Sequence, residues 1–380
     1  MSSILRHILL VFMVFFAIGT SVEAKTIQGG TVKVGVMLPL HDINGDGRRM
    51  VEYYRGVLMA CDSLRHLGVS VDVKAWNVPE DADIRKTLKD KDASSCNLII
   101  GPLYSSQVKP LADFAKNNDI KLLIPFSINT AEVDRNSNLF QVYQSPDEFN
   151  NLVISQFIER FKGHHVIFID CNDTTSRKGP FTFGLRRKLE QLGRTYSITN
   201  VKSSEEYFSK AFSRTLPNVV VLNTGRSPEL NLAFAKLDNL TMNNTTLKIK
   251  MFGYTEWMMY TKHAIDHFYK YEAFIPGAYH YNPLSSRTSR FQLKYRWNFH
   301  SDMIQALPRF AITGFDQAFY FIRGLYLYGD KFTGAAGTVG YTPIQTPLRF
   351  EKTASEGGYK NKSILFIHYL PGHRVETIHF

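Results

Sequence analysis

The stretch LIIGPLYSSQVKPLADFAKNNDIKLLIPFSINT, residues 98–130, decides the fold of this chain. It begins with an apolar run that a Gly-Pro pair ends, continues with a helical pattern at residues 109–117, and returns to an apolar run at residues 121–124. Short runs without alternating polar residues are typical of strands buried on both faces, and a helix between two of them is the usual crossover of parallel strands. The stretch therefore predicts a β-α-β unit of a parallel sheet.

The same alternation extends in both directions from this stretch. Upstream, strands are expected at residues 32–38 and 69–75, with a helix between them that ends near residue 64. Downstream, a helix at residues 148–161 opens a second series of strands, expected at residues 166–170, 197–201, 219–223 and 248–253. A chain of 380 residues is too long for one ordinary core. The sequence therefore predicts an α/β protein with two doubly wound, Rossmann-like lobes.

The loops after the expected strands are the first place to look for a binding site. In open α/β sheets, ligands bind beyond the carboxyl ends of the strands, where loops and helix amino ends converge. These loops are residues 40–49, 101–107, 125–130, 172–181, 224–228 and 253–257.

The first 24 residues have the pattern of a secretory signal peptide. Arg6 and His7 precede an apolar run at residues 8–18, and small residues at Val22 and Ala24 favour cleavage after Ala24. The run is short for a membrane span, and no later stretch is apolar for long enough to be one. We expect an exported, soluble, unanchored protein that acts in the periplasm.

The chain is basic, with a formal net charge of +11, and its densest basic stretch is residues 287–296. A nucleic-acid binder would gather such residues on a stripe with interleaved aromatic side chains. The stretch also fits an amphipathic helix with Phe291 and Tyr295 inward and the basic residues outward, and this interpretation is favoured over nucleic-acid binding. A basic exported protein would also sit well against an anionic cell envelope.

Motifs for catalysis or metal binding are weak. Asp42, Asn44, Asp46 and Gly47 match the start of a calcium loop, but Tyr53 occupies the twelfth position, so a helix-capping loop is favoured. No G-x-S-x-G elbow, phosphate loop or spaced Cys-His-acid set is present. The sequence predicts no enzymatic activity, no cofactor and no metal site.

The cysteines leave two alternatives open. Cys61, Cys96 and Cys171 show no C-x-x-C spacing, which argues against a zinc ribbon or a thioredoxin-type motif. An oxidising compartment could join Cys61 to Cys96, but buried free thiols are at least as compatible with their positions.

Residues 98–130 resemble the corresponding part of the leucine/isoleucine/valine-binding proteins, which are type I periplasmic binding proteins of ABC transporters. Four further segments are similar to that family in the same order: VKVGVMLPL, QVYQSPDEF, AITGFDQAFYFIRGLYLYG and TPLRFEKTASEGGYKNKSILFIHY. Order and spacing hold over essentially the whole chain after the signal peptide. The first loop, HDINGDGRRM, departs from the family pattern.

The resemblance implies two lobes joined by a hinge of three crossings, near residues 141–146, 274–279 and 341–349. Neither lobe is then continuous in sequence. The expected division is a signal peptide at 1–24, lobe I at 30–143 plus 278–343, and lobe II at 144–277 plus 344–380. Such lobes close on a ligand by hinge motion.

The resemblance also implies which residues contact the ligand. Hydroxyl and amide groups of the first lobe would hold a carboxylate, an acidic residue of the second lobe would take an ammonium group, and aromatic residues would form the walls, with Trp257 a further candidate. Ordinary helix capping and core packing are alternative roles for the same residues. The expected set is Tyr104, Ser105, Ser106, Phe126, Ser127, Asn129, Phe181, Tyr254 and Glu256.

The expected function is that of a monomeric solute-binding protein. It would bind a small polar molecule, with an amino acid or related zwitterion as the first choice, and deliver it to an ABC transporter permease or a sensor. Nucleic acid is not an expected partner. The alternative is a cell-envelope scaffold or regulator of the same fold, whose degenerate cleft contacts another envelope protein.

Overall fold

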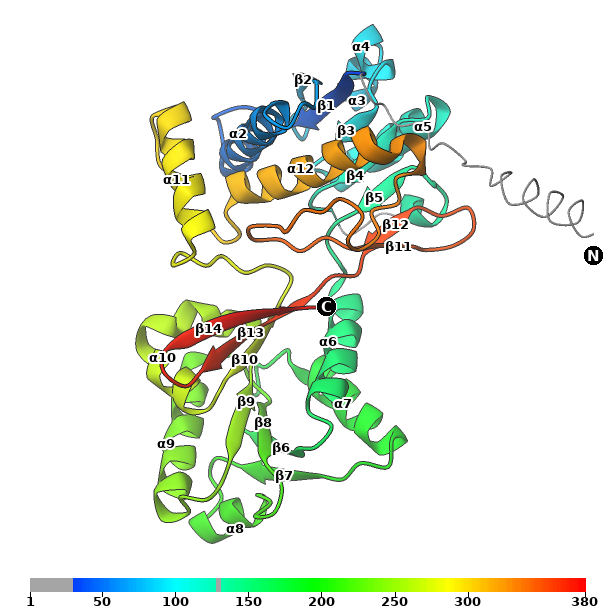
Figure 1. Ribbon diagram of the computed structural model, residues 1–380. Helices are drawn as coiled ribbons and strands as arrows, with labels where there is room; N and C mark the ends of the chain where they lie inside the picture. The colour runs from blue at the N-terminus through cyan, green and yellow to red at the C-terminus, as the bar shows by residue number, and fades with distance from the viewer. Residues whose placement is uncertain (1–29, 128–130) are drawn as a thin grey trace, which may run out of the picture.

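The computed structural model describes residues 30–127 and 131–380. The expected signal peptide and the expected ligand contact Asn129 lie outside the described residues. The described chain forms two α/β lobes, one above the other in Figure 1. Within this part of the chain, no helix combines the length and the apolar character that a membrane span requires.

The first lobe is built on a mostly parallel sheet with the strand order β11-β12-β5-β4-β3-β1-β2. Only the β11–β12 pair among these neighbours is antiparallel. The expected β-α-β unit is confirmed, since β3 and β4 pair in parallel and α5 connects them. The strands are β1 (Val32–Leu38), β2 (Val71–Asn77), β3 (Leu98–Ile100), β4 (Lys121–Ile124), β5 (Leu139–Gln141), β11 (Phe350–Lys352) and β12 (Tyr359–Asn361).

Helices cover both faces of this sheet. The long helices α2 (Gly45–Arg65) and α12 (Phe310–Tyr328) share a core on one face. Helix α5 (Val108–Asn117) and the short helices α3 (Ile84–Thr87) and α4 (Lys91–Ser94) pack against the other. Helix α11 (Ser286–Phe299) packs at the side of α2 and α12.

Two glycines allow α2 and α12 to lie backbone to backbone. A Cβ atom at Gly56 would lie 1.9 Å from the carbonyl oxygen of Ala311, and a Cβ atom at Gly314 would lie 2.1 Å from that of Tyr53. Both distances are far below van der Waals contact. Glycine is therefore required at both positions of this helix pair.

The second lobe repeats the plan with the strand order β14-β13-β10-β9-β8-β6-β7. Its strands are β6 (His165–Asp170), β7 (Tyr196–Asn200), β8 (Asn218–Leu222), β9 (Ile249–Phe252), β10 (Phe274–Gly277), β13 (Leu365–Leu370) and β14 (Arg374–His379). Its helices are α6 (Pro146–Arg160), α7 (Gly179–Gln191), α8 (Glu205–Lys210), α9 (Ser227–Asn243) and α10 (Thr261–Lys270). The expected strands of the second series are confirmed to within two residues at each end.

The chain passes between the lobes after β5, after β10 and after β12 (Figure 1). The first two crossings follow Gln141 and Gly277, close to the expected positions. The third differs, because β11 and β12 extend the first sheet beside β5, whereas the expected boundary at residue 343 places them in the second lobe. The first lobe therefore continues to Asn361.

All three cysteines are buried free thiols. Cys61 lies in the core between the first sheet and α2, and Cys96 lies in the core on the α5 side. The alternative of a Cys61–Cys96 disulfide is therefore wrong, because the sheet separates the two side chains.

Candidate ligand-binding site

Two serine hydroxyls of the first lobe meet at the carboxyl edge of its sheet. Ser105 begins the 3-10 helix η1 (Ser105–Gln107) after β3, and Ser127 follows β4. Because β3 and β4 are parallel neighbours, their ends bring the hydroxyls together, with 3.0 Å between the two Oγ atoms. Each hydroxyl has one proton, so the pair uses one proton internally, and the other has no acceptor among the residues that the structure describes.

The neighbours of Ser105 take different positions. Ser106 is exposed, and Tyr104 is half-buried. Burial raises the pKa of Tyr104, and the carboxylate of Asp46 in the first turn of α2 raises it further. The side-chain oxygen of Asn44 caps α2 by accepting from the backbone N–H of Gly47 at 2.8 Å, which confirms a capping loop here.

Phe126 belongs to an aromatic cluster of the first lobe. Its ring centroid lies 5.4 Å from that of Tyr53, 5.8 Å from that of Phe310 and 5.9 Å from that of Tyr143. Tyr143 lies in the first crossing, directly after β5. Phe126 thus joins the helical core to the hinge, and it does not line the cavity described next.

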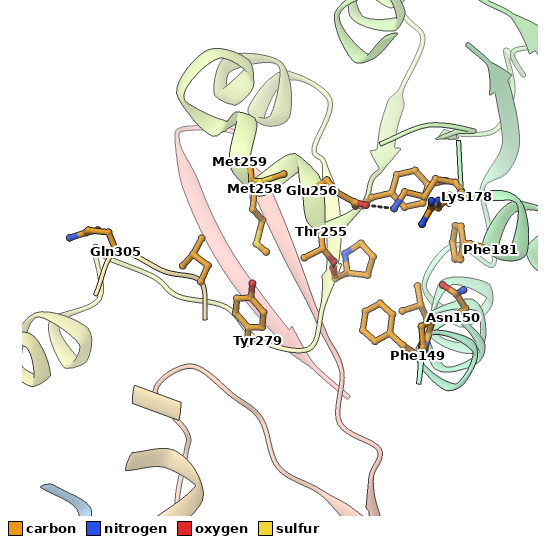
Figure 2. Close-up of a pocket in the computed structure, with 16 residues that line it drawn as sticks. Phe149, Asn150, Lys178, Phe181, Thr255, Glu256, Met258, Met259, Tyr279 and Gln305 are labelled. Carbon is orange, nitrogen blue, oxygen red and sulfur yellow. Dashed lines mark hydrogen bonds and ion pairs between the residues drawn. The ribbon is translucent and has the colours of Figure 1, made fainter. Parts of the chain in front are cut away.

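The second lobe contributes most of a cavity of about 720 Å³ that opens between the lobes. Figure 2 shows its walls, which come from the start of α6, the loop before α7, the 3-10 helix η3 (Thr255–Tyr260), the second crossing and the segment between α11 and α12. The lining residues are Pro146, Phe149, Asn150, Val153, Arg177, Lys178, Phe181, Tyr254, Thr255, Glu256, Met258, Met259, Pro276, Tyr279, Gln305 and Leu307. Phe181, Tyr254 and Glu256 of the expected set are among them, whereas Tyr104, Ser105, Ser106, Phe126 and Ser127 are not.

An ion pair forms the charged end of the cavity. The Lys178 ammonium group donates to the Glu256 carboxylate, and it lies 4.6 Å from the centroid of the Tyr254 ring (Figure 2). Arg177 is exposed beside them, and no carboxylate partner for it is found within the described residues. The charged end thus holds two cations and one carboxylate.

The apolar wall has fixed and adaptable parts. The Tyr254 hydroxyl donates to the carbonyl oxygen of Leu222 at 2.5 Å, and burial raises the pKa of Tyr254 well above its usual range, so this ring is a rigid wall. Phe181 packs edge-to-face on Tyr254, with 5.8 Å between ring centroids. Met258 and Met259 bring flexible side chains that adapt to ligand shape.

Trp257 has a different role from the expected cavity wall. Its side chain is fully buried and stacks on Phe268 with a centroid distance of 5.8 Å. A Cβ atom at Gly253 would lie 2.2 Å from the indole, so the glycine makes the room in which the ring packs. Trp257 belongs to the core of the second lobe.

Sequence reasoning identified the loops of the site better than its side chains. Lys178 lies in the expected ligand loop at residues 172–181, but nothing in the sequence pairs it with Glu256, 78 residues away. Phe149 and Asn150 were missed because they lie on a helix rather than in a strand-end loop. Both residues lie in the first turns of the helix that follows the first crossing, and this position next to the hinge could have indicated them.

Comparisons with known proteins support the fold. No family model matches the sequence, and no curated protein matches it. A protein from Rhodospirillum rubrum, provisionally assigned as a branched-chain amino acid ABC transporter, has a TM-score of 0.61 at 12% identity, with 92% of this chain and 100% of that chain covered. A branched-chain amino acid ABC transporter periplasmic ligand-binding protein from Burkholderia xenovorans has a TM-score of 0.51 at 12% identity, with 91% and 94% covered. With its two mostly parallel α/β sheets, this chain has the type I periplasmic binding protein fold.

Proposed function

We propose that this protein binds a small zwitterion, an amino acid in the first instance, by closing its two lobes. The observation that carries the proposal is the cavity of about 720 Å³ with an ion pair at one end and apolar walls. A concave, largely apolar space with a few convergent polar groups is the usual form of a small-molecule site. Its volume suits a ligand of amino-acid to short-peptide size.

The Lys178–Glu256 ion pair of the cavity favours a zwitterion, while the exposed Arg177 beside it faces solvent. In the open state, Lys178 and Glu256 neutralise each other. A zwitterion could take the place of this ion pair, with its ammonium group beside Glu256 and its carboxylate beside Lys178. A ligand with one charge would leave one of these side chains unpaired in a closed site, and an unpaired buried charge is strongly unfavourable.

The first lobe would complete the site on closure. The Ser105 and Ser127 hydroxyls offer one free proton and several lone pairs at the edge of the first sheet. Tyr279 in the second crossing and Pro276 at the end of β10 both line the cavity wall, so the hinge and the ligand space adjoin. Ligand binding would shift the population from open to closed because only the closed state contacts the ligand from both sides.

This role implies a soluble periplasmic partner of an ABC permease, or of a sensor, that acts as a monomer without catalysis. The fold supports this assignment, since the Rhodospirillum rubrum and Burkholderia xenovorans structures are both described as branched-chain amino acid ABC transporter proteins. An envelope scaffold of the same fold remains the second candidate.

A matched ligand series tests the proposal. Leucine, 3-methylbutylamine and 4-methylpentanoic acid share an apolar body and differ in their charges, and thermal shift and calorimetry would measure their binding alongside a wider amino-acid and peptide panel. We expect only zwitterions to stabilise the protein, by about 2.7 kcal/mol at a hundredfold excess over Kd. The absence of binding by every compound of the panel would contradict the proposal and favour the envelope-scaffold function. Equal binding of the singly charged analogues would also contradict the proposal.

Variants locate the site. Glu256→Gln removes the partner of a ligand ammonium group and should weaken binding at least tenfold, whereas Ser105→Ala removes one hydroxyl and should weaken it about fivefold. Ser209→Ala, on the exposed surface of α8, is the matched control and should leave the Kd unchanged. Unchanged binding in both cleft variants would place the ligand elsewhere.

A further inference from the structure

Helix α11 has one face in the core and one face in water. Phe291 and Tyr295 are buried against α2 and α12, where Phe291 meets Phe315 at a centroid distance of 5.2 Å. The opposite face of the helix points outward at the edge of the first lobe (Figure 1). This outward face is separate from the cavity between the lobes, which no residue of α11 lines.

The outward face exposes large apolar side chains. Leu293 is 63% exposed and Trp297 is 82% exposed, and their spacing of four residues places them side by side on the helix. Leu284, two residues before the helix, is 90% exposed. Single exposed apolar residues are common, but a tryptophan beside a leucine on one helix face forms a patch that suits a partner surface.

The same helix is strongly cationic. It carries four basic residues and no acidic residue. Lys294 pairs with Asp62 at 2.7 Å and Arg296 with Asp302 at 2.7 Å. The other two, Arg287 and Arg290, have no carboxylate partner within the described residues.

Both arginines donate to backbone oxygens, and the Arg287 guanidinium also lies over the Tyr341 ring, 5.9 Å from its centroid. The guanidinium of Arg287 donates to the carbonyl oxygen of Thr342 at 2.7 Å, and that of Arg290 donates to the carbonyl oxygen of Ser286 at 3.3 Å. By helical spacing, Arg290 lies in the exposed stripe with Leu293 and Trp297, and Arg287 lies at its border. The exposed Arg290 therefore shares one helix face with the apolar groups, and the half-buried Arg287 lies beside that face.

We infer that this face of α11 docks on an anionic lipid surface. Helices that lie in the membrane interface place leucine and tryptophan at the acyl boundary and basic residues at the phosphate groups. Charge complementarity supports a lipid partner, because the whole chain has a net charge of +11. A helix face can also dock on a lipid bilayer without a groove of matching shape, because the membrane interface is soft. Docking would hold the first lobe at the membrane while the second lobe remains free to move relative to it.

Tryptophan fluorescence gives a direct readout of this docking. Trp257 is fully buried, and Trp76 is half-buried with its indole N–H bonded to Asp90 at 3.0 Å, so Trp297 is the tryptophan that a bilayer would reach. The protein without residues 1–24 would be mixed with vesicles of phosphatidylcholine alone or of phosphatidylcholine with phosphatidylglycerol, because anionic lipids attract clustered basic residues. We expect binding, a blue shift and quenching by brominated lipid only with the anionic vesicles, and weaker binding at high salt.

Matched variants separate a specific face from general basicity. Arg287→Gln with Arg290→Gln should weaken partitioning roughly tenfold or more, because each basic residue near an anionic membrane contributes about fivefold. Arg187→Gln with Lys188→Gln removes two charges from the exposed surface of α7 in the second lobe and should leave partitioning nearly unchanged. Leu293→Ser should reduce both partitioning and the blue shift, and circular dichroism would verify that each variant is folded.

Two results would overturn the inference. One is the absence of binding to the anionic vesicles at low salt. The other is an equal loss in the α11 and α7 double variants, which would mean that total charge, and not this helix face, attracts the lipid. Leucine binding by the cleft is measured without vesicles, so failure here leaves the proposed ligand function untouched.

Discussion

Burial determines the chemistry of the cysteine side chains. It raises the pKa of Cys61 and of Cys171 to about 12 and that of Cys96 to about 11, so all three are protonated thiols near neutral pH. Since the thiolate is the reactive form, we expect native protein at pH 8 to react very slowly with Ellman's reagent. Unfolding in guanidinium should release three reactive thiols. Rapid release of even one from native protein would show that its side chain is accessible.

Residue-scale prediction succeeded where strand ends fixed the geometry. The sequence places Ser105 and Ser127 directly after two strands, and these strands are parallel neighbours that end at the same edge of the sheet. Prediction at this scale failed to distinguish side chains that pack in the core from side chains that line the cavity. Glu256 and Trp257 are one position apart, yet one lines the cavity and the other fills the space above Gly253. The local sequence does not determine which of the two residues is buried, because burial here depends on the tertiary contacts of η3.

At the scale of elements, the close packing of α2 against α12 depends on Gly56. Gly56→Ala would place a methyl group 1.9 Å from the Ala311 carbonyl oxygen, so the two helices must separate. We expect the free energy of unfolding to fall by about 3 kcal/mol or more, measured by urea denaturation. Gly45→Ala, at the open start of α2, has nothing within 4 Å and should change stability little. Equal stability of both variants would mean that the helices adjust without cost.

The elements themselves were predictable where apolar residues dominate. Strands such as β1 and β8 are apolar almost throughout, and their positions agree with expectation. Strands β11 and β12 read FEK and YKN, which gives no apolar run, and so the third crossing was expected too early. Backbone pairing at the sheet edge forms these two strands, and Phe350 and Tyr359 are the isolated apolar side chains by which they pack on the core.

At the scale of the whole molecule, a histidine beside the hinge predicts acid sensitivity. Burial, together with the nearby His379, lowers the pKa of His280 to about 4, and its Nδ1 lies 2.8 Å from the Thr377 hydroxyl in the second lobe. Because the unfolded chain takes up this proton at higher pH, the stabilisation is present above about pH 6.5 and is lost as the pH falls toward 4. The contribution is about 2 to 3 kcal/mol.

Thermal unfolding from pH 7 to pH 4.5 measures this effect. The loss of stability on acidification should be smaller in His280→Asn, which keeps a polar partner for Thr377 but cannot titrate. His66→Asn, at an exposed position after α2, is the control and should follow the parent protein. The same pH dependence in all three proteins would assign the acid sensitivity to other groups.

The discontinuous lobes also constrain how the molecule is made. The first sheet ends with β11 and β12, and the second ends with β13 and β14, so both are finished by the last part of the chain. During synthesis, neither lobe can complete its sheet until residues 350–379 have left the ribosome. The growing polypeptide therefore cannot lock into a complete lobe before its last strands are made.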